Sequence, residues 1–307
     1  MKKYFIIAFV AFCHIIAIAD DRYYYTGPQV RLAASQYTCE LIGSLQSSPE
    51  QSLQGIDCWG EYIVAIQKDG TTSTYHYDGS TLSKVGTTSL TGFSEKSLPN
   101  ECCFSSQFFA NSDKMPLLFV SQSSQEKNVM KNGILLVERI VNNLKSSKLV
   151  AKIQLKEAKK LFENTLLWTI DRENNFLYGI GSTNENNKHR IVKFKLPLIS
   201  TKSKNVQTIL LSEKNLMENY IIEDYYPHCN QLIAQGAMVK YGFLYLPVGD
   251  GTEEQPSQLY VWDLSRRKMQ NVIDLSKSTK GKVDDCAEYM GELLIQAQGV
   301  LYKIRFQ

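Results

Sequence analysis

The chain has 307 residues, of which 43% are hydrophobic and 21% are charged, and its formal net charge is +3. This length and hydrophobic content are enough for one large all-β domain with a sizeable core. The near-neutral charge argues against nucleic acid or an anionic membrane surface as the main partner.

Residues 1–19 are typical of a cleavable signal peptide. Lys2 and Lys3 form a positive start, an apolar run extends from Tyr4 to Ile18, and Ala17-Ile18-Ala19 fits the small-x-small pattern before a cleavage point. The apolar run is short for a transmembrane helix. Cleavage would remove Lys2 and Lys3 and lower the net charge from +3 to +1. We therefore predict one mature domain over residues 20–307, secreted or periplasmic and not inserted in the membrane, and we expect a monomer.

Five apolar, strand-like runs recur along the chain. They are Tyr62–Gln67, Pro116–Ser121, Asn175–Gly181, Phe243–Val248 and Glu292–Ala297. Each run is flanked by further strand-like segments, so that it forms the second strand of a four-stranded unit. The third unit, for example, reads Leu166–Asp171, Phe176–Gly181, Arg190–Leu196 and Val206–Leu211. Repetition at this spacing is typical of a β-propeller.

The last unit lacks a fourth strand, and the chain has one strand to spare near its beginning. Tyr37–Gly43 reads as a strand that belongs to no unit. A propeller avoids free sheet edges when such a strand completes its last sheet. The sequence therefore predicts an all-β, five-bladed β-propeller that is closed by an N-terminal strand.

Two short helical insertions are expected between units. Leu155, Ala158, Leu161 and Phe162 fall on one helical face. Ser212 could cap a second helix that extends through Glu218. Both precede the first strand of a unit, so they should lie where the connections between blades run.

Some segments resemble known propeller sequences. Leu259–Leu264 contains Trp262-Asp263 and resembles the end of a WD40 repeat. His228-Cys229-Asn230 and Pro116–Ser121 resemble two hallmarks of secreted bacterial β-propeller proteins in the WD40/quinoprotein-like superfamily. That resemblance implies the fold and export, and it implies no particular activity.

Six cysteines remain once Cys13 is removed with the signal peptide. An even count in an exported protein allows disulfides, and six thiols permit 15 pairings. Buried free thiols that pack as small hydrophobic groups fit the same sequence. The sequence leaves both alternatives open for Cys39, Cys58, Cys102, Cys103, Cys229 and Cys286.

Polar residues precede a cysteine at the approach to four innermost strands. The segments are Asp57-Cys58, Glu101-Cys102, His228-Cys229-Asn230 and Asp284-Asp285-Cys286. Because innermost strands line the propeller axis, these side chains should converge at one channel mouth. Tyr225 and Tyr226 lie just before His228, and their rings could stack on a sugar or a peptide. The candidate ligand-binding residues are Asp57, Glu101, His228, Asn230, Asp285, Tyr225 and Tyr226.

Several uses of this mouth are compatible with the sequence. The carboxylates and His228 could hold a divalent cation, act as a general acid and base on a sugar, or simply be solvated. The sequence contains no nucleophile elbow, P-loop or dinucleotide fingerprint. We predict a binding module for a glycan or protein ligand, without a cofactor. The alternative is a polysaccharide hydrolase or lyase that uses Asp57, Glu101 and Asp285.

Overall fold

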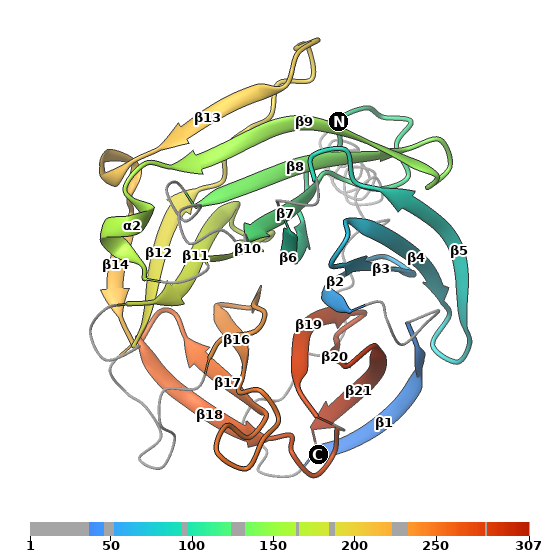
Figure 1. Ribbon diagram of the computed structural model, residues 1–307, viewed down its shortest axis with the longest axis vertical. Coiled ribbons are helices and arrows are strands. Elements are labelled where there is room, and N and C mark those ends of the chain that lie inside the picture. The colour runs from blue at the N-terminus through green and yellow to red at the C-terminus, as the bar shows by residue number, and fades with distance from the viewer. Residues whose placement is uncertain are drawn as a thin grey trace, which may run out of the picture.

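The computed structural model describes residues 37–45, 52–93, 98–123, 133–163, 166–183, 188–222, 233–279 and 281–306. Within them, five small sheets stand around a common axis as a five-bladed β-propeller (Figure 1). The predicted fold class is confirmed. No helix in this part of the chain is both long and apolar enough to cross a membrane.

Each blade starts at the axis and proceeds outward. The first consists of β2 (Leu53–Trp59), β3 (Tyr62–Gln67), β4 (Thr71–Tyr77) and β5 (Leu82–Ser89). The second begins with β6 (Leu98–Phe104), β7 (Leu118–Ser123), β8 (Ile134–Val141) and β9 (Ser146–Leu155). The third begins with β10 (Leu167–Asp171), β11 (Phe176–Ser182) and β12 (His189–Lys195). The fourth consists of β15 (Met238–Lys240), β16 (Phe243–Val248), β17 (Gln258–Asp263) and β18 (Lys268–Asp274). The fifth begins with β19 (Val283–Tyr289), β20 (Glu292–Ala297) and β21 (Val300–Phe306).

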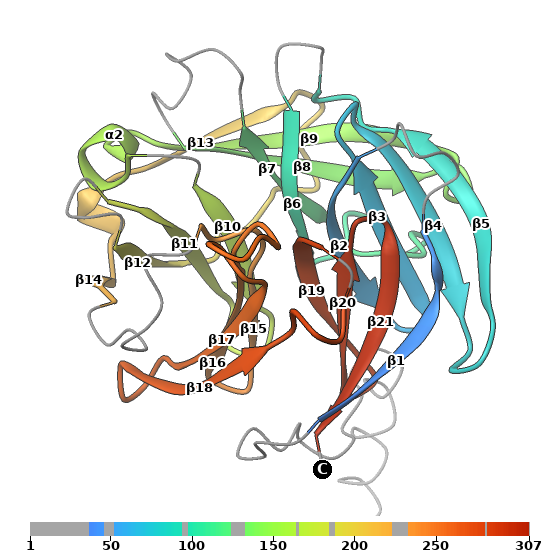
Figure 2. The same ribbon diagram turned by 60° about the horizontal axis from the view of Figure 1, so that its bottom comes forward.

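The fifth blade is completed by the N-terminal strand, as predicted. β1 (Tyr37–Ser44) pairs antiparallel with β21, and the two run side by side in Figure 2. The buried ammonium of Lys303 in β21 lies 3.5 Å from Glu40 Oε2 of β1 and 3.4 Å from the Tyr77 hydroxyl of the first blade. The Tyr289 hydroxyl also donates to the Tyr77 carbonyl. These contacts join the two ends of the ring.

One strand assignment from the sequence is wrong. Residues 206–211 were expected as the outer strand of the third blade, but β13 (Gln207–Leu211) pairs parallel with β9 as a fifth strand of the second blade. The outer place in the third blade is taken by β14 (Glu218–Ile221), which pairs with β12. Leu211 is buried in the core between the two blades. The alternating pattern of residues 207–211 fits either sheet edge, so it does not determine the partner strand.

The two expected helical insertions are present but shorter than predicted. α2 (Ala158–Leu161) buries Ala158 and Leu161 between the second and third blades. The second is a 3₁₀ turn, η2 (Glu213–Asn215), in which Asn215 Oδ1 accepts hydrogen bonds from Ser212 N and Oγ at 3.0 and 3.1 Å. It does not reach Glu218 because Leu216 is extended and β14 begins two residues later.

The two ends of the propeller differ. The turns after the first and third strands of the blades lie at one end, here called the turn face, and the connections between blades lie at the other, the connection face. Tyr241-Gly242 and Met290-Gly291, which follow two innermost strands, have φ values of 52°, 78°, 48° and 82°. Two successive positive φ values are typical of the type I′ hairpin, which continues the twist of its strands. These tight turns leave the ends of the innermost strands accessible at the turn face.

Candidate functional site

Asp57 and Asp285 join neighbouring innermost strands. Asp285 Oδ2 accepts from Ile56 N of the first blade and its Oδ1 from Cys286 N, both at 2.8 Å. Asp57 repeats the arrangement one blade on, because Oδ2 accepts from Phe104 N at 2.5 Å and Oδ1 from Cys58 N at 2.7 Å. The recurring acid-Cys pattern is therefore a device that connects one blade to the next, since each carboxylate satisfies a backbone amide of its neighbour.

Asp57 is also paired with Arg172, at the end of the third blade's innermost strand. Arg172 Nη2 donates to Asp57 Oδ2, Nε donates to the Phe104 carbonyl at 2.9 Å, and Nη1 donates to the Cys58 carbonyl at 3.0 Å. Burial works against the charge of Arg172, and the Asp57 carboxylate more than offsets it, so the pKa of the guanidinium is raised above its ordinary value. Arg172 thus links three blades around one carboxylate.

Glu101 differs from both aspartates. Its side chain is 1% exposed, and neither carboxyl oxygen has a hydrogen-bond partner of normal geometry among the residues that the structure describes. Burial, and then the charge of Asp285, raise the pKa of Glu101 well above its ordinary value, although the nearby amides of Ala237 and Trp168 oppose the rise. Burial also raises the pKa of Asp285. The buried site therefore favours the neutral form of Glu101 over the ionised form.

Two glycines allow this close packing of acids. A Cβ atom on Gly236 would lie 2.2 Å from Asp285 Oδ1, and one on Gly55 would lie 2.9 Å from Cys102 N. Any larger residue would push the innermost strands apart. Asp57, Glu101 and Asp285 do come together around the axis, but at 5%, 1% and 0% exposure they lie within the wall of innermost strands rather than at an open mouth.

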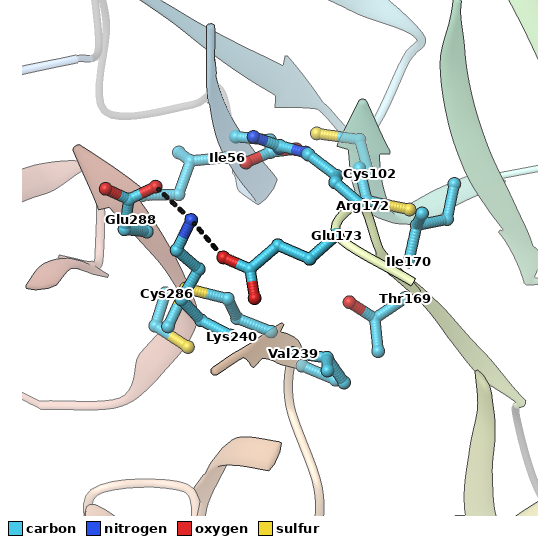
Figure 3. Close-up of a pocket in the computed structure, with 14 residues that line it drawn as sticks. Ile56, Cys102, Thr169, Ile170, Arg172, Glu173, Val239, Lys240, Cys286 and Glu288 are labelled. Atoms are coloured by element: carbon cyan, nitrogen blue, oxygen red, sulfur yellow. Dashed lines mark hydrogen bonds and ion pairs between the residues drawn. The ribbon is translucent and has the colours of Figure 1, made fainter. Parts of the chain in front are cut away.

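A hollow does open at the turn face, where the innermost strands end, and the buried Asp57 is one of the residues that line it. All five innermost strands contribute to it, and its cavity volume is about 30 Å³. Arg172, Glu173, Lys240 and Glu288 stand around it (Figure 3). We call these four residues the charged ring.

Lys240 is the centre of the charged ring. Its ammonium lies 3.1 Å from Glu173 Oε1 and 3.6 Å from Glu288 Oε2, as the dashed lines in Figure 3 show. Burial disfavours the charge of Lys240, and the two glutamates outweigh it, so its pKa is raised. The side chains of Lys240 and Glu288 are 16% and 14% exposed and that of Glu173 is 32% exposed, so all of them can be reached from solvent.

Sequence reasoning did not find the charged ring. The search followed the residues ahead of the innermost strands, whereas these residues end or directly follow them, within three positions of the next hairpin turn. The sequence did contain a signal that could have predicted the charged ring, because charged residues recur at the turns that follow the innermost strands.

The remaining predicted site residues, Tyr225, Tyr226, His228 and Asn230, lie outside the described residues. Within the described part of the chain, no three His, Cys, Asp or Glu side chains are placed to hold a metal ion together. The divalent cation that the sequence allows as an alternative is not tested, because His228 is outside this part.

The five cysteines that the structure describes are free thiols. Cys58, Cys102, Cys103 and Cys286 are buried, and burial raises the pKa of each thiol. Cys103 Sγ donates to the Trp168 carbonyl of the next blade at 3.5 Å. These thiols pack between blades as small, mostly apolar groups. Cys229 lies outside the described residues.

Comparison with known proteins gives no family assignment. No protein-family model matches the chain, and no curated protein matches it. Among solved structures, the chain is similar to a gluconolactonase from Xanthomonas campestris, with 11% identity and a TM-score of 0.43, over 91% of this chain and 94% of that chain. A similarity at this level carries no argument about the site or its chemistry.

Proposed function

We propose that this protein is an exported, non-enzymatic binding module whose glycan or protein ligand docks over the charged ring on the turn face. The supporting observation is the hollow that all five blades share, which is edged by partly exposed charges of both signs. Clefts with a few convergent polar groups are the usual location of ligand sites.

The size of the hollow indicates how the ligand binds. A space of about 30 Å³ holds roughly two water molecules. A sugar ring or a peptide cannot enter as a whole. The ligand would therefore cover the charged ring from outside and insert at most a small polar group, which exchanges contacts with Lys240 or Glu173.

The acids beneath the ring favour binding over catalysis. A hydrolase or lyase of the predicted kind needs two carboxyl groups roughly 5–10 Å apart that reach a substrate. Asp57, Glu101 and Asp285 are buried, and Asp57 is fully engaged with two amides and Arg172. Asp57 and Asp285 instead stabilise the contacts between neighbouring blades of the propeller.

A pair of variants with a matched control tests the proposal. Glu173→Gln/Lys240→Gln removes one ion pair of the charged ring. Lys193→Gln/Glu218→Gln removes a similar pair outside it, whose side chains are 16% and 27% exposed and whose charged atoms are 2.9 Å apart. A glycan array and a pull-down from the extracellular fraction would be run with the unaltered protein and both variants. We expect the ring variant to lose at least one ligand that both the unaltered protein and the control variant retain.

The same experiment separates the two ends of the channel. A Tyr225→Ala/Tyr226→Ala variant alters the tyrosines that the sequence assigned to the mouth. If this variant loses the ligands and the ring variant keeps them, binding is not at the turn face and the proposal is wrong.

A further inference from the structure

A second hollow lies on the turn face, on the second blade and away from the charged ring. It is formed by the long connection between β6 and β7 and by the hairpin between β8 and β9. Its cavity volume is about 330 Å³. Its polar lining includes Asp113, Lys114, Arg139, Asn142, Asn143 and Lys148. A volume of this size is in the range of small-ligand sites.

Arg139 is fixed at the wall of this hollow. Its Nε and Nη2 donate to the two carboxylate oxygens of Asp113 at 2.8 and 2.7 Å. Its guanidinium also lies 5.1 Å from the centre of the Phe109 ring. A guanidinium held on both sides keeps its orientation, and Nη1 is not used by the Asp113 pair.

The hollow carries an excess of positive charge. Lys148 stands directly opposite Arg139 in the β8–β9 pairing, so the two side chains leave the sheet on the same face. Like charges in this position destabilise a sheet. Asp113 neutralises Arg139, while Lys114 and Lys148 are exposed and have no acidic side chain within 4.0 Å in the part of the chain that the structure describes. Two ammonium groups without an acidic partner, those of Lys114 and Lys148, therefore lie near Arg139, which is already paired with Asp113.

The hairpin that closes the hollow has an unusual backbone and packs against the first blade. Asn142, Asn143 and Leu144 all have positive φ, at 49°, 59° and 71°. Leu144 is buried against the first blade, where a Cβ atom on Gly86 would lie 2.8 Å from the Leu144 carbonyl oxygen. The buried Leu144 anchors one end of this turn, and Asn142 and Asn143 directly precede it at the rim.

We propose that this hollow binds an acidic saccharide, with its carboxylate against Lys114, Lys148 and the free side of Arg139. Charge-assisted hydrogen bonds from a guanidinium and two ammonium groups match such an anion. The amides of Asn142 and Asn143 supply both donors and acceptors for ring hydroxyls. This site is separate from the charged ring and does not depend on the function proposed for it.

Calorimetric titration of the purified full-length mature protein tests the proposal with four probes. They are tetragalacturonate, its fully methyl-esterified form, sodium sulfate and a short single-stranded oligonucleotide. We expect tetragalacturonate to bind at least about 10-fold more tightly than each of the others, because only it offers both the anion and the hydroxylated ring. Equal or tighter binding of any other probe, or no binding of tetragalacturonate, overturns the proposal.

Variants locate the binding on the molecule. Lys114→Gln/Lys148→Gln should raise the Kd for tetragalacturonate by about 10-fold or more. Lys68→Gln/Lys277→Gln removes the same charge from two exposed lysines elsewhere and should change the Kd less than about 2-fold. Equal effects of the two variants would mean general electrostatic attraction and would refute the site. All four lysines are exposed, and Lys148→Gln relieves the repulsion between Lys148 and Arg139, so neither variant should melt below the unaltered protein.

Discussion

Replacement of Glu101 by glutamine should stabilise the protein relative to the unaltered protein, and this difference in the free energy of unfolding should grow as the pH rises. The folded state holds the Glu101 proton more tightly than the unfolded state, whose carboxyl has an ordinary pKa near 4.5. Stability is therefore lost with increasing pH from about 4.5 up to the raised pKa. The loss approaches about 1.4 kcal/mol for each pH unit between the ordinary pKa and the raised one. Glutamine resembles the neutral acid in shape and has no proton to lose.

The assay is urea unfolding at a series of pH values, followed by tryptophan fluorescence. The Glu101→Gln variant and the unaltered protein should have similar free energies of unfolding at pH 4.5 and diverge above it, with the variant more stable. Glu163→Gln, at an exposed position, serves as the control and should leave the pH dependence unchanged. If the difference between Glu101→Gln and the unaltered protein does not grow with pH, Glu101 is ionised in the fold and the reasoning fails.

Four further predictions follow from the contacts and the sequence. Arg172→Met should lower the free energy of unfolding by about 3–5 kcal/mol in chemical denaturation, because it leaves the buried Asp57 carboxylate without its cation; a loss below about 1 kcal/mol would contradict this. Deletion of β1 should expose the edge of β21 and produce dimers or aggregates in size-exclusion chromatography, whereas a monomer with an unchanged melting temperature would show that β1 does not close the ring. N-terminal sequencing of the exported protein should begin at Asp20, and a retained Met1 would rule out cleavage. A cation in the channel should raise the melting temperature in calcium or zinc, and the idea is wrong if metal analysis and melting both show no binding.

The sequence predicted the number of blades because two separate observations agreed. The repeat supplied five similar strands, and the missing strand of the last unit matched the spare strand at residues 37–43. The same pattern could not assign residues 207–211 to the correct blade. An alternating pattern of five residues indicates which side chains are buried, but it does not identify the partner strand. A parallel pairing with β9 is as compatible with it as an antiparallel pairing with β12.

The sequence did not predict the charged ring, but it did predict that three buried acids lie near the axis beneath it. The acid-Cys pattern correctly brought Asp57, Glu101 and Asp285 around one axis. The structural role of this pattern could not be predicted from the sequence. The partners of Asp57 and Asp285 in the next blade are backbone amides, and backbone amides carry no signature in the sequence. Glu101 precedes a cysteine just as Asp57 does, yet its longer side chain ends in a place without donors of normal geometry among the described residues. Arg172 was missed because its three partners come from segments at least 68 positions away in the chain.

The parallel strand β13 has a consequence for the order in which the protein forms. The chain leaves the second blade, builds three strands of the third, returns to the edge of the second through β13, and only then supplies β14 to finish the third. Neither sheet can be completed before residue 211 has emerged from the ribosome. The second and third blades should therefore protect their amides from hydrogen exchange as one cooperative unit, while the first and fourth blades can open separately.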